Sequence, residues 1–280
     1  MAGAPRSEAI VAVVTGASRG IGRGCAVELG RIGATVYVTG RTIEARESLP
    51  GTIGATAEEV GAAGGRGIPV RCDHRDDGAV AALFAQVERE HGRLDVLVNN
   101  AFKIPRELTS GRPFWQTPIS NWDDMVGVGT RSAYVASWHA VPLMQKAGRG
   151  LIANVSSSGA REYAWHVAYG VGKAALDRFT ADAAKELRSH GIAVVSLWPG
   201  LVRTERNQGA QQIDHALDWS GAESLYFTGR AIAALAGDPD VLARTGSAWT
   251  SRELADAYGF RDVDGRLPRG PLHNRPGGVA

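Results

Sequence analysis

The segment Ile10-Val11-Ala12-Val13-Val14-Thr15-Gly16-Ala17-Ser18-Arg19-Gly20-Ile21-Gly22 decides the fold. It opens with a short apolar, largely β-branched run, which is typical of a buried parallel strand. A turn with the spacing Gly-x-x-x-Gly-x-Gly follows and leads into a helical pattern. Such a strand, turn and helix bind dinucleotides, because glycine lets the backbone approach a pyrophosphate and the helix N-terminus offers free N–H groups. The alternative is an ordinary glycine turn.

Apolar runs and helical stretches alternate along the rest of the chain. This order predicts one α/β domain over residues 1–280, with a doubly wound parallel sheet of the Rossmann type. The predicted strands are Ile10–Val14, Thr35–Thr39, Ile68–Cys72, Leu94–Val98, Leu151–Val155 and Ala193–Leu197. The predicted helices are Ile21–Ile32, Asp77–His91, Trp122–Met144 and one that carries Tyr169 and Lys173. Residues 1–8 and the end after Arg266 are expected to be mobile, and residues 245–280 to form a C-terminal extension.

Tyr169 and Lys173 are four residues apart, so a helix places both side chains on one face. An ammonium group beside a phenol favours the phenolate, and we expect Lys173 to lower the pKa of Tyr169 toward a value useful for proton transfer. The pair is a candidate general acid/base. The pattern alone is weak, because with four lysines and six tyrosines in the chain it arises by chance in about one such chain in eleven.

Five motifs follow one another in order, namely Thr15–Gly22, Leu94–Ala101, Ser156-Ser157, Tyr169-x-x-x-Lys173 and Trp198-Pro199-Gly200. Together they resemble the short-chain dehydrogenase/reductase (SDR) family over nearly the whole chain. Gly200–Glu205 and Glu253–Gly265 are similar to one subfamily within it. The resemblance implies an enzyme that moves a hydride between a nicotinamide cofactor and a carbonyl or alcohol group of a small-molecule substrate.

The resemblance also implies the catalytic roles. Tyr169 donates a proton to a carbonyl oxygen or accepts one from an alcohol, Lys173 assists it and holds the ribose hydroxyls, and a serine bonds the substrate oxygen. Counting back from Tyr169 selects Ser156, whereas aligning from the preceding strand selects Ser157. We assign Ser157, because a loop absorbs a one-residue deletion more easily than a buried strand changes register.

The predicted cofactor contacts come from the glycine-rich turn and from residues that follow later strands. They are Gly16, Ser18, Arg19, Gly20, Ile21, Gly22, Arg41, Asp73, Asn99, Tyr169, Lys173, Pro199, Gly200, Val202 and Thr204. The resemblance places Asp73 beside the adenine, Asn99 close to the cofactor and Thr204 at the nicotinamide carboxamide. For Asp73 and Asn99 the alternative is a turn residue that bonds its own backbone.

The end of the second predicted strand, Val38-Thr39-Gly40-Arg41, bears on the choice of cofactor. NAD-binding proteins normally carry an acidic residue here for the ribose 2′-hydroxyl. Arg41 and Arg19 instead offer guanidinium groups to a 2′-phosphate, so we expect NADP(H) to be preferred, with NAD(H) as the alternative. The alternative is that both arginines are ordinary surface residues, because arginines are abundant in this chain, which has 31 lysines and arginines of which only four are lysines.

Gly129 departs from the family pattern, which has an asparagine at this place in the long helix. The asparagine helps to hold a water molecule that links the lysine to solvent. We expect Gly129 to leave room for an ordered water bonded to backbone groups, so that the proton path is altered and not lost.

Several aromatic residues and two long segments are candidates for the substrate pocket. The aromatic residues are Phe102, Tyr163, Trp165 and Trp198, and the segments are Phe102–Pro118 and Asn207–Tyr226. Loops of this kind determine specificity but name no substrate.

The composition of the chain limits the kinds of molecule that the protein is expected to bind. The formal charge is +2, which favours neither nucleic acid nor a charged membrane surface. Cys25 and Cys72 are the only cysteines, which suits a reducing compartment, and no signal peptide or long apolar span is present, so we expect a cytoplasmic protein without a membrane partner. The seven histidines lack metal-ligand spacing, so no metal is predicted. The resemblance implies a homodimer or homotetramer.

These observations predict an NADP(H)-dependent oxidoreductase. One alternative is an SDR-fold dehydratase or epimerase, which shows no net change in nicotinamide absorbance. Another is a cofactor-sensing protein that binds without turnover. The set Ser157, Tyr169 and Lys173 argues against the sensor, whereas Gly129 argues slightly for it.

Overall fold

Strand β1 (Val11–Val14) is buried along its whole length, as its apolar sequence predicts. Successive side chains of a strand point to opposite faces, so Ala12 and Val14 join one hydrophobic core while Val11 and Val13 join another. The chain then turns into helix α1 (Gly20–Arg31). The computed structural model describes residues 9–45, 50–206 and 218–271. The expectations for residues 1–8, 207–217 and 272–280 therefore lie outside the described residues.

The central sheet has seven parallel strands in the order β3-β2-β1-β4-β5-β6-β9. The strands after β1 are β2 (Thr35–Gly40), β3 (Arg66–Arg71), β4 (Val96–Asn99), β5 (Gly150–Val155), β6 (Ile192–Trp198) and β9 (Ala248–Thr250). A small pair, β7 (Val202–Arg203) and β8 (Glu223–Ser224), lies apart from this sheet. The strand order reverses between β1 and β4, and ligands of doubly wound sheets bind at such a switch point.

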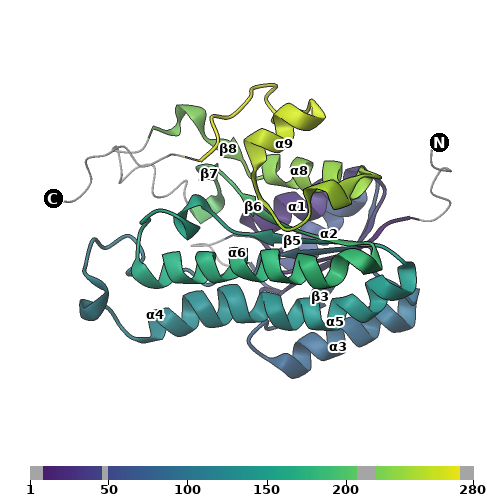
Figure 1. The fold of residues 1–280 in the computed structure, drawn as a ribbon, viewed down its shortest axis with the longest axis horizontal. Coiled ribbons are helices and arrows are strands. Elements are labelled where there is room, and N and C mark those ends of the chain that lie inside the picture. Colours follow the sequence, from purple (N-terminus) through teal and green to yellow (C-terminus); the bar gives the residue numbers. More distant parts are fainter. Residues whose placement is uncertain (1–8, 46–49, 207–217, 272–280) are drawn as a thin grey trace.

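Helices cover both faces of the sheet. They are α2 (Ile53–Ala62), α3 (Asp77–His91), α4 (Ser120–Trp122), α5 (Ser132–Ala147), α6 (Val167–Leu187), α8 (Phe227–Gly237) and α9 (Ser251–Tyr258). Short 3₁₀ turns occur at Phe114–Gln116, Ser158–Ala160, Arg188–His190, Trp219–Gly221 and Val241–Arg244. Figure 1 shows α3, α5 and α6 on one side of the sheet and α1, α2 and α8 on the other. The predicted single-domain, doubly wound fold is confirmed.

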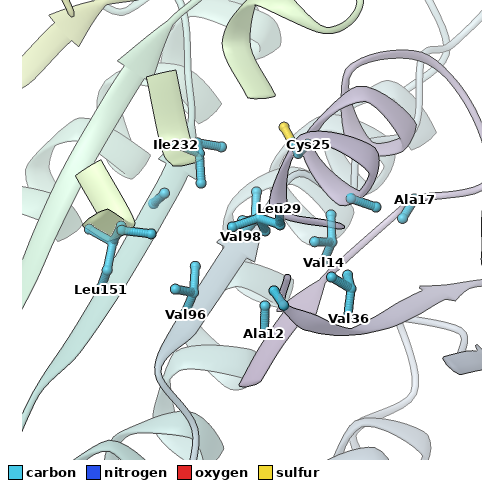
Figure 2. Packing of buried hydrophobic residues seen from close by; sticks show 14 of the residues in the cluster. Ala12, Val14, Ala17, Cys25, Leu29, Val36, Val96, Val98, Leu151 and Ile232 are labelled. Carbon is cyan, nitrogen blue, oxygen red and sulfur yellow. The ribbon is translucent and has the colours of Figure 1, made fainter. Parts of the chain in front are cut away.

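Two cores hold these layers together. Figure 2 shows the first, in which Cys25 and Leu29 of α1 and Ile232 of α8 pack on Val14 and Val98 of the sheet. The second core joins the opposite sheet face to α3, α5 and α6. Burial of apolar surface on both faces is the main force that holds the sheet and its helices together, and the parallel order places the carboxyl ends of the strands at one edge of the sheet.

The long helix predicted over Trp122–Met144 is present, but it is not uniform. A π-helix spans Asp123–Arg131 between α4 and α5, and it contains Gly129. π-Helical turns frequently occur at functional sites. Strand β9 and helices α2, α8 and α9 were not predicted. None of the helices in the described part of the chain combines the length and hydropathy needed to span a bilayer.

Candidate active site

The glycine-rich loop packs tightly against the end of β4. Gly16 has a φ of +64°, and a methyl group there would lie 2.8 Å from Cα of Ala101. A methyl group on Gly22 would lie 2.3 Å from Nδ2 of Asn100. These close approaches require glycine. Ser18 is buried in the loop, and Ile21 is half-buried against the first core.

Asn100 holds the loop, and Asn99 does not. Nδ2 of Asn100 donates hydrogen bonds of 3.0 Å to the carbonyl oxygens of Thr15 and Gly16. The side chain of Asn99 lies inside the protein, with 4% exposure, and Nδ2 donates to Ser137 and Asn154. The side chain of Asn99 is therefore engaged inside the protein, and the expectation that Asn99 lies close to the cofactor stays a prediction. Asn99 is the last residue of β4, and its amide is used to join β4 to β5 and α5.

Glu205 lies at the N-terminus of α1, and sequence reasoning missed it. Its Oε2 accepts a 2.9 Å hydrogen bond from the backbone N–H of Gly20, and its Oε1 lies 3.0 Å from Nη1 of Arg23. A negative charge is favourable at this end of a helix. The neighbouring Thr204 also meets the loop, because a methyl group on Gly20 would lie 3.5 Å from its Cγ2. The structure thus brings the segment that ends at Glu205 against the glycine-rich loop, and no motif in the sequence signals this contact.

Arg41 follows β2 and Asp73 follows β3, so both lie at carboxyl strand ends. Nη1 of Arg41 is 3.9 Å from Oδ2 of Asp73, and the Arg41 side chain is 54% exposed. Arg75 binds Asp73 more closely, at 2.6 Å, and its hydrogen bonds lower the pKa of Asp73 to about 2. The guanidinium of Arg41 is therefore accessible to a ligand, while Asp73 is an ionised carboxylate held mainly by Arg75.

Arg19 differs from Arg41 in its surroundings. Its Nε and Nη2 donate to the carbonyl oxygens of Pro50 and Gly51, at 3.1 and 2.9 Å. These bonds fasten the connection between β2 and α2 to the glycine-rich loop. The two arginines predicted to share a 2′-phosphate thus include one exposed guanidinium and one that already binds backbone carbonyls.

Ser157, Tyr169 and Lys173 come together between β5 and α6. The Tyr169 hydroxyl donates a 2.8 Å hydrogen bond to Oγ of Ser157, and Nζ of Lys173 lies 5.7 Å from the Tyr169 ring centroid. Lys173 is buried and donates to the carbonyl of Val155 at 2.9 Å. Ser156 is turned inward, where its hydroxyl donates to the backbone carbonyl of Lys173. The geometry therefore favours Ser157 over Ser156 as the serine that faces Tyr169.

Burial dominates the titration of both catalytic candidates. It raises the pKa of Tyr169, although the bond to Ser157 acts in the opposite direction. It lowers the pKa of Lys173 to about 8, although Asp177 opposes the shift. The expected lowering of the Tyr169 pKa by Lys173 is not found, because burial of the phenol disfavours the phenolate and raises the pKa.

The space beside Gly129 is filled by a side chain. A methyl group on Gly129 would lie 2.9 Å from Cδ2 and 3.2 Å from Cε2 of Phe102. The expectation that Gly129 leaves room for an ordered water is therefore wrong for its Cβ direction. The sequence indicates Phe102 only as a candidate pocket residue.

Pro199 and Gly200 follow β6, and a second buried acid supports them. The backbone N–H of Gly200 donates a 2.8 Å hydrogen bond to Oε1 of Glu223. Glu223 has no exposed surface, and burial raises its pKa to about 8. A methyl group on Gly200 would also lie 2.7 Å from the carbonyl oxygen of Gly270. Glu223 was not predicted, since only the folded chain brings it to this turn.

Of the other predicted pocket residues, Trp198 is buried and its indole N–H donates to Asp177 at 3.1 Å. Tyr163 and Trp165 are 66% and 43% exposed. Trp165 has a φ of +63°, which is uncommon for a residue other than glycine. The next residue, His166, caps α6 by accepting from Ala168.

Val202 is buried in β7, two residues before Thr204. In the part of the chain that the structure describes, no group of three or more His, Cys, Asp or Glu residues is arranged to hold a metal ion.

Known proteins resemble this chain in sequence and in structure. A family model described as short chain dehydrogenase matches residues 10–214. Dehydrogenase/reductase SDR family member 1 of Mus musculus is 47% identical over 269 residues, which cover 91% of this chain and 84% of the relative. A putative dehydrogenase from Xanthomonas campestris superposes with a TM-score of 0.82 at 26% identity, covering 95% of this chain and 98% of that one. A metagenomic short-chain oxidoreductase in complex with NADP superposes with a TM-score of 0.69 at 33% identity, covering 86% and 95%.

Proposed function

This chain belongs to the short-chain dehydrogenase/reductase family, and we propose that it is an NADP(H)-dependent oxidoreductase acting on a carbonyl or secondary alcohol group of a small molecule. The observation that carries the proposal is the 2.8 Å hydrogen bond from Tyr169 to Ser157, close to the buried ammonium of Lys173. It places two hydroxyl groups at one point, where both can act on one substrate oxygen.

The three side chains divide the proton chemistry between them. Ser157 donates a hydrogen bond to the substrate carbonyl oxygen, and Tyr169 transfers its phenolic proton to the same oxygen. Lys173 stabilises the phenolate that remains, because its ammonium lies near the ring in a water-poor site. In the oxidative direction Tyr169 accepts the proton. A nicotinamide cofactor, when bound, supplies or accepts the hydride.

Several features of the loop and of the strand ends fit an NADP cofactor. The carboxylate of Glu205 on the N–H of Gly20 indicates that this helix N-terminus attracts anionic oxygen, as a pyrophosphate requires. The exposed guanidinium of Arg41 suits a 2′-phosphate, and the metagenomic relative was solved with NADP. We propose that Ser18, Arg19, Gly20 and Ile21 bind the phosphates, and that Pro199, Gly200, Val202 and Thr204 border the nicotinamide.

A panel of ketones and aldehydes with NADPH, followed by the nicotinamide absorbance, tests this proposal. We expect substrate-dependent oxidation of NADPH by the wild-type protein and none by Tyr169→Phe. Conversion of a substrate without an absorbance change would indicate dehydratase or epimerase chemistry instead. Tight NADPH binding without turnover across a broad panel would indicate a cofactor sensor.

We also propose that the protein is a cytoplasmic homodimer or homotetramer. Tyr134 and Trp138 lie one turn apart on α5 and are 57% and 65% exposed, and exposed aromatic side chains are enriched at protein interfaces. Both cysteines are free and buried, which suits a reducing compartment. Analytical ultracentrifugation tests the assembly, and a sedimenting monomer at micromolar concentration would reject it.

A further inference from the structure

The ring of Phe102 lies against three residues of the candidate site. It fills the space beside Gly129, where a methyl group would come within 2.9 Å of the ring. Nζ of Lys173 lies 4.8 Å from its centroid, within the range of a cation–π interaction. The Phe102 and Tyr169 rings meet edge to face, with centroids 5.9 Å apart and planes at 77°. One side chain thus contacts both titratable groups and the unusual glycine.

We propose that Phe102 is a positioning residue, whose ring occupies the volume of a side chain at position 129 and holds the Lys173 ammonium against its π face in a water-poor site. The inference rests on the proposed role of Lys173. It makes Phe102 and Gly129 a matched pair, because the ring fits only while residue 129 has no side chain. The ring of Phe102 then keeps water from approaching Lys173 through the space that a side chain at position 129 would fill.

Few charges act on Lys173 among the described residues. On α6 itself, Asp177 lies one turn later and favours the ammonium, and the phenol of Tyr169 is the other titratable group nearby. Strand β5 contributes only the neutral carbonyl of Val155 at this point. The π-helix that packs on α6 carries charges that are exposed or paired elsewhere, namely Asp123, Asp124 with Lys103, and Arg131 with Asp77. Desolvation is therefore the main influence, and it lowers the pKa of Lys173 to about 8.

The ring acts on this pKa in two opposing ways. Its π face stabilises the ammonium and raises the pKa, while its bulk excludes water and lowers the pKa. Phe102→Ala removes both effects and admits water, so the pKa should rise toward the ordinary value of lysine. Phe102→Leu keeps much of the apolar volume but lacks the π face, so its pKa should stay below that of the alanine variant.

NMR of protein labelled with [ε-13C]lysine measures these pKa values directly. The chain has four lysines, so the spectrum is simple, and Lys173→Arg assigns the signal. We expect Phe102→Ala to raise the Lys173 pKa by about one unit or more, and Phe102→Leu to give a value at least roughly half a unit below that. Phe114→Leu, which changes a phenylalanine packed on Trp115, is the control and should leave the signal unchanged.

Two outcomes would overturn the proposal. One is a Phe102→Ala pKa within about half a unit of the wild type, and the other is an equal rise in the alanine and leucine variants. The titration needs neither substrate nor turnover. A protein inactive toward every carbonyl compound could still show the expected shifts, so failure of the proposed function is distinguishable from failure of this inference.

Substitution of two glycines in the same π-helix tests the matched pair. Gly129→Ala places a methyl group against Phe102, whereas a methyl group on Gly127 would have no atom within 4 Å. We expect Gly129→Ala to lower Tm by roughly 2 °C or more and to shift the Lys173 signal, and Gly127→Ala to do neither. In the Phe102→Ala background Gly129→Ala should no longer lower Tm. An equal loss of Tm in both backgrounds would mean that Phe102 and Gly129 are not coupled.

Discussion

The carboxylate of Glu205 accepts a hydrogen bond of 2.9 Å from the backbone N–H of Gly20, the first residue of α1. In the proposed function this N–H faces the cofactor pyrophosphate, so the chain supplies its own anion at a phosphate site. Binding of the cofactor must move Glu205 or bring two anions together, and either event opposes binding.

Replacement of Glu205 by glutamine should therefore tighten NADPH binding. Interactions of a charge with a helix N-terminus amount to about 0.3–1 kcal/mol. The Kd for NADPH, measured by fluorescence titration, should therefore be roughly two- to fivefold lower in the variant. Glu59→Gln is the matched control, since Glu59 also pairs with Arg23, at 2.9 Å. An unchanged or higher Kd for Glu205→Gln would show that Glu205 supports the loop instead.

Tyr169→Phe should abolish most turnover while NADPH still binds. The substitution deletes the transferable proton but keeps the ring that packs on Phe102, and we expect kcat to fall by about 10² or more. Ser157→Ala should also lower kcat strongly, whereas Ser156→Ala should mainly affect stability because Ser156 bonds backbone. A larger kcat loss for Ser156→Ala than for Ser157→Ala would reverse the assignment.

Arg41→Ala should discriminate between the two nicotinamide cofactors. Loss of a charge-assisted bond to the 2′-phosphate removes roughly 1.5–3 kcal/mol, so Kd for NADPH should rise about tenfold or more while Kd for NADH changes little. Arg31→Ala, at the far end of α1, is a control with a similarly exposed side chain, 53% against 54%. Equal weakening of NADPH and NADH by Arg41→Ala would contradict a role in phosphate recognition.

Glu223 should make stability depend on pH. In the folded protein its pKa is raised from 4.5 to about 8, so between these values the folded state holds a proton that the unfolded chain has released. Stability contributed by this group is therefore present at low pH and is lost as pH rises through this window, by on the order of 5 kcal/mol in total. Glu223→Gln retains an acceptor for Gly200 without this titration.

Urea unfolding of the wild type and Glu223→Gln at about pH 5 and about pH 8 measures the effect. The variant should gain stability relative to the wild type at the higher pH. A difference between the two proteins that does not change with pH would mean that Glu223 is ionised throughout.

Most strands and helices of the sheet could be predicted, because capping residues and apolar runs in the sequence agree with the burial that the fold imposes. Helix α3 begins and ends where predicted, since Asp76 caps its N-terminus and Gly92 ends it in the left-handed conformation. Strands β1, β2, β4, β5 and β6 were found because their apolar runs are buried along their whole length, whereas β3, at the edge of the sheet, is exposed or half-buried. Helices α2 and α8 were missed, since short stretches rich in alanine and glycine give little periodicity. Helix α9 was missed although Thr250 and Glu253 form a capping box at its N-terminus, a signal that the sequence does carry.

The candidate site was predictable where the motif residues themselves meet in the folded chain, as Tyr169 and Ser157 do through a 2.8 Å hydrogen bond. It was not predictable where neighbours far apart in sequence decide the outcome. Nothing in the doublet Asn99-Asn100 shows which amide turns inward, because the strand end determines that. The contact of Phe102 with Gly129 likewise exists only once the turn after β4 packs against the π-helix.

The partners of the turn at Gly200 determine when this turn can form during synthesis of the chain. It is held by Glu223 and faces the carbonyl of Gly270, while the backbone N–H of Ser224 donates to Asp262. Synthesis runs from the N-terminus, so the glycine-rich loop and its neighbouring strands emerge long before these partners. A nascent chain on the ribosome can thus build the glycine-rich loop and its neighbouring strands early, whereas the turn at Gly200 gains its partners only after Gly270 has been translated.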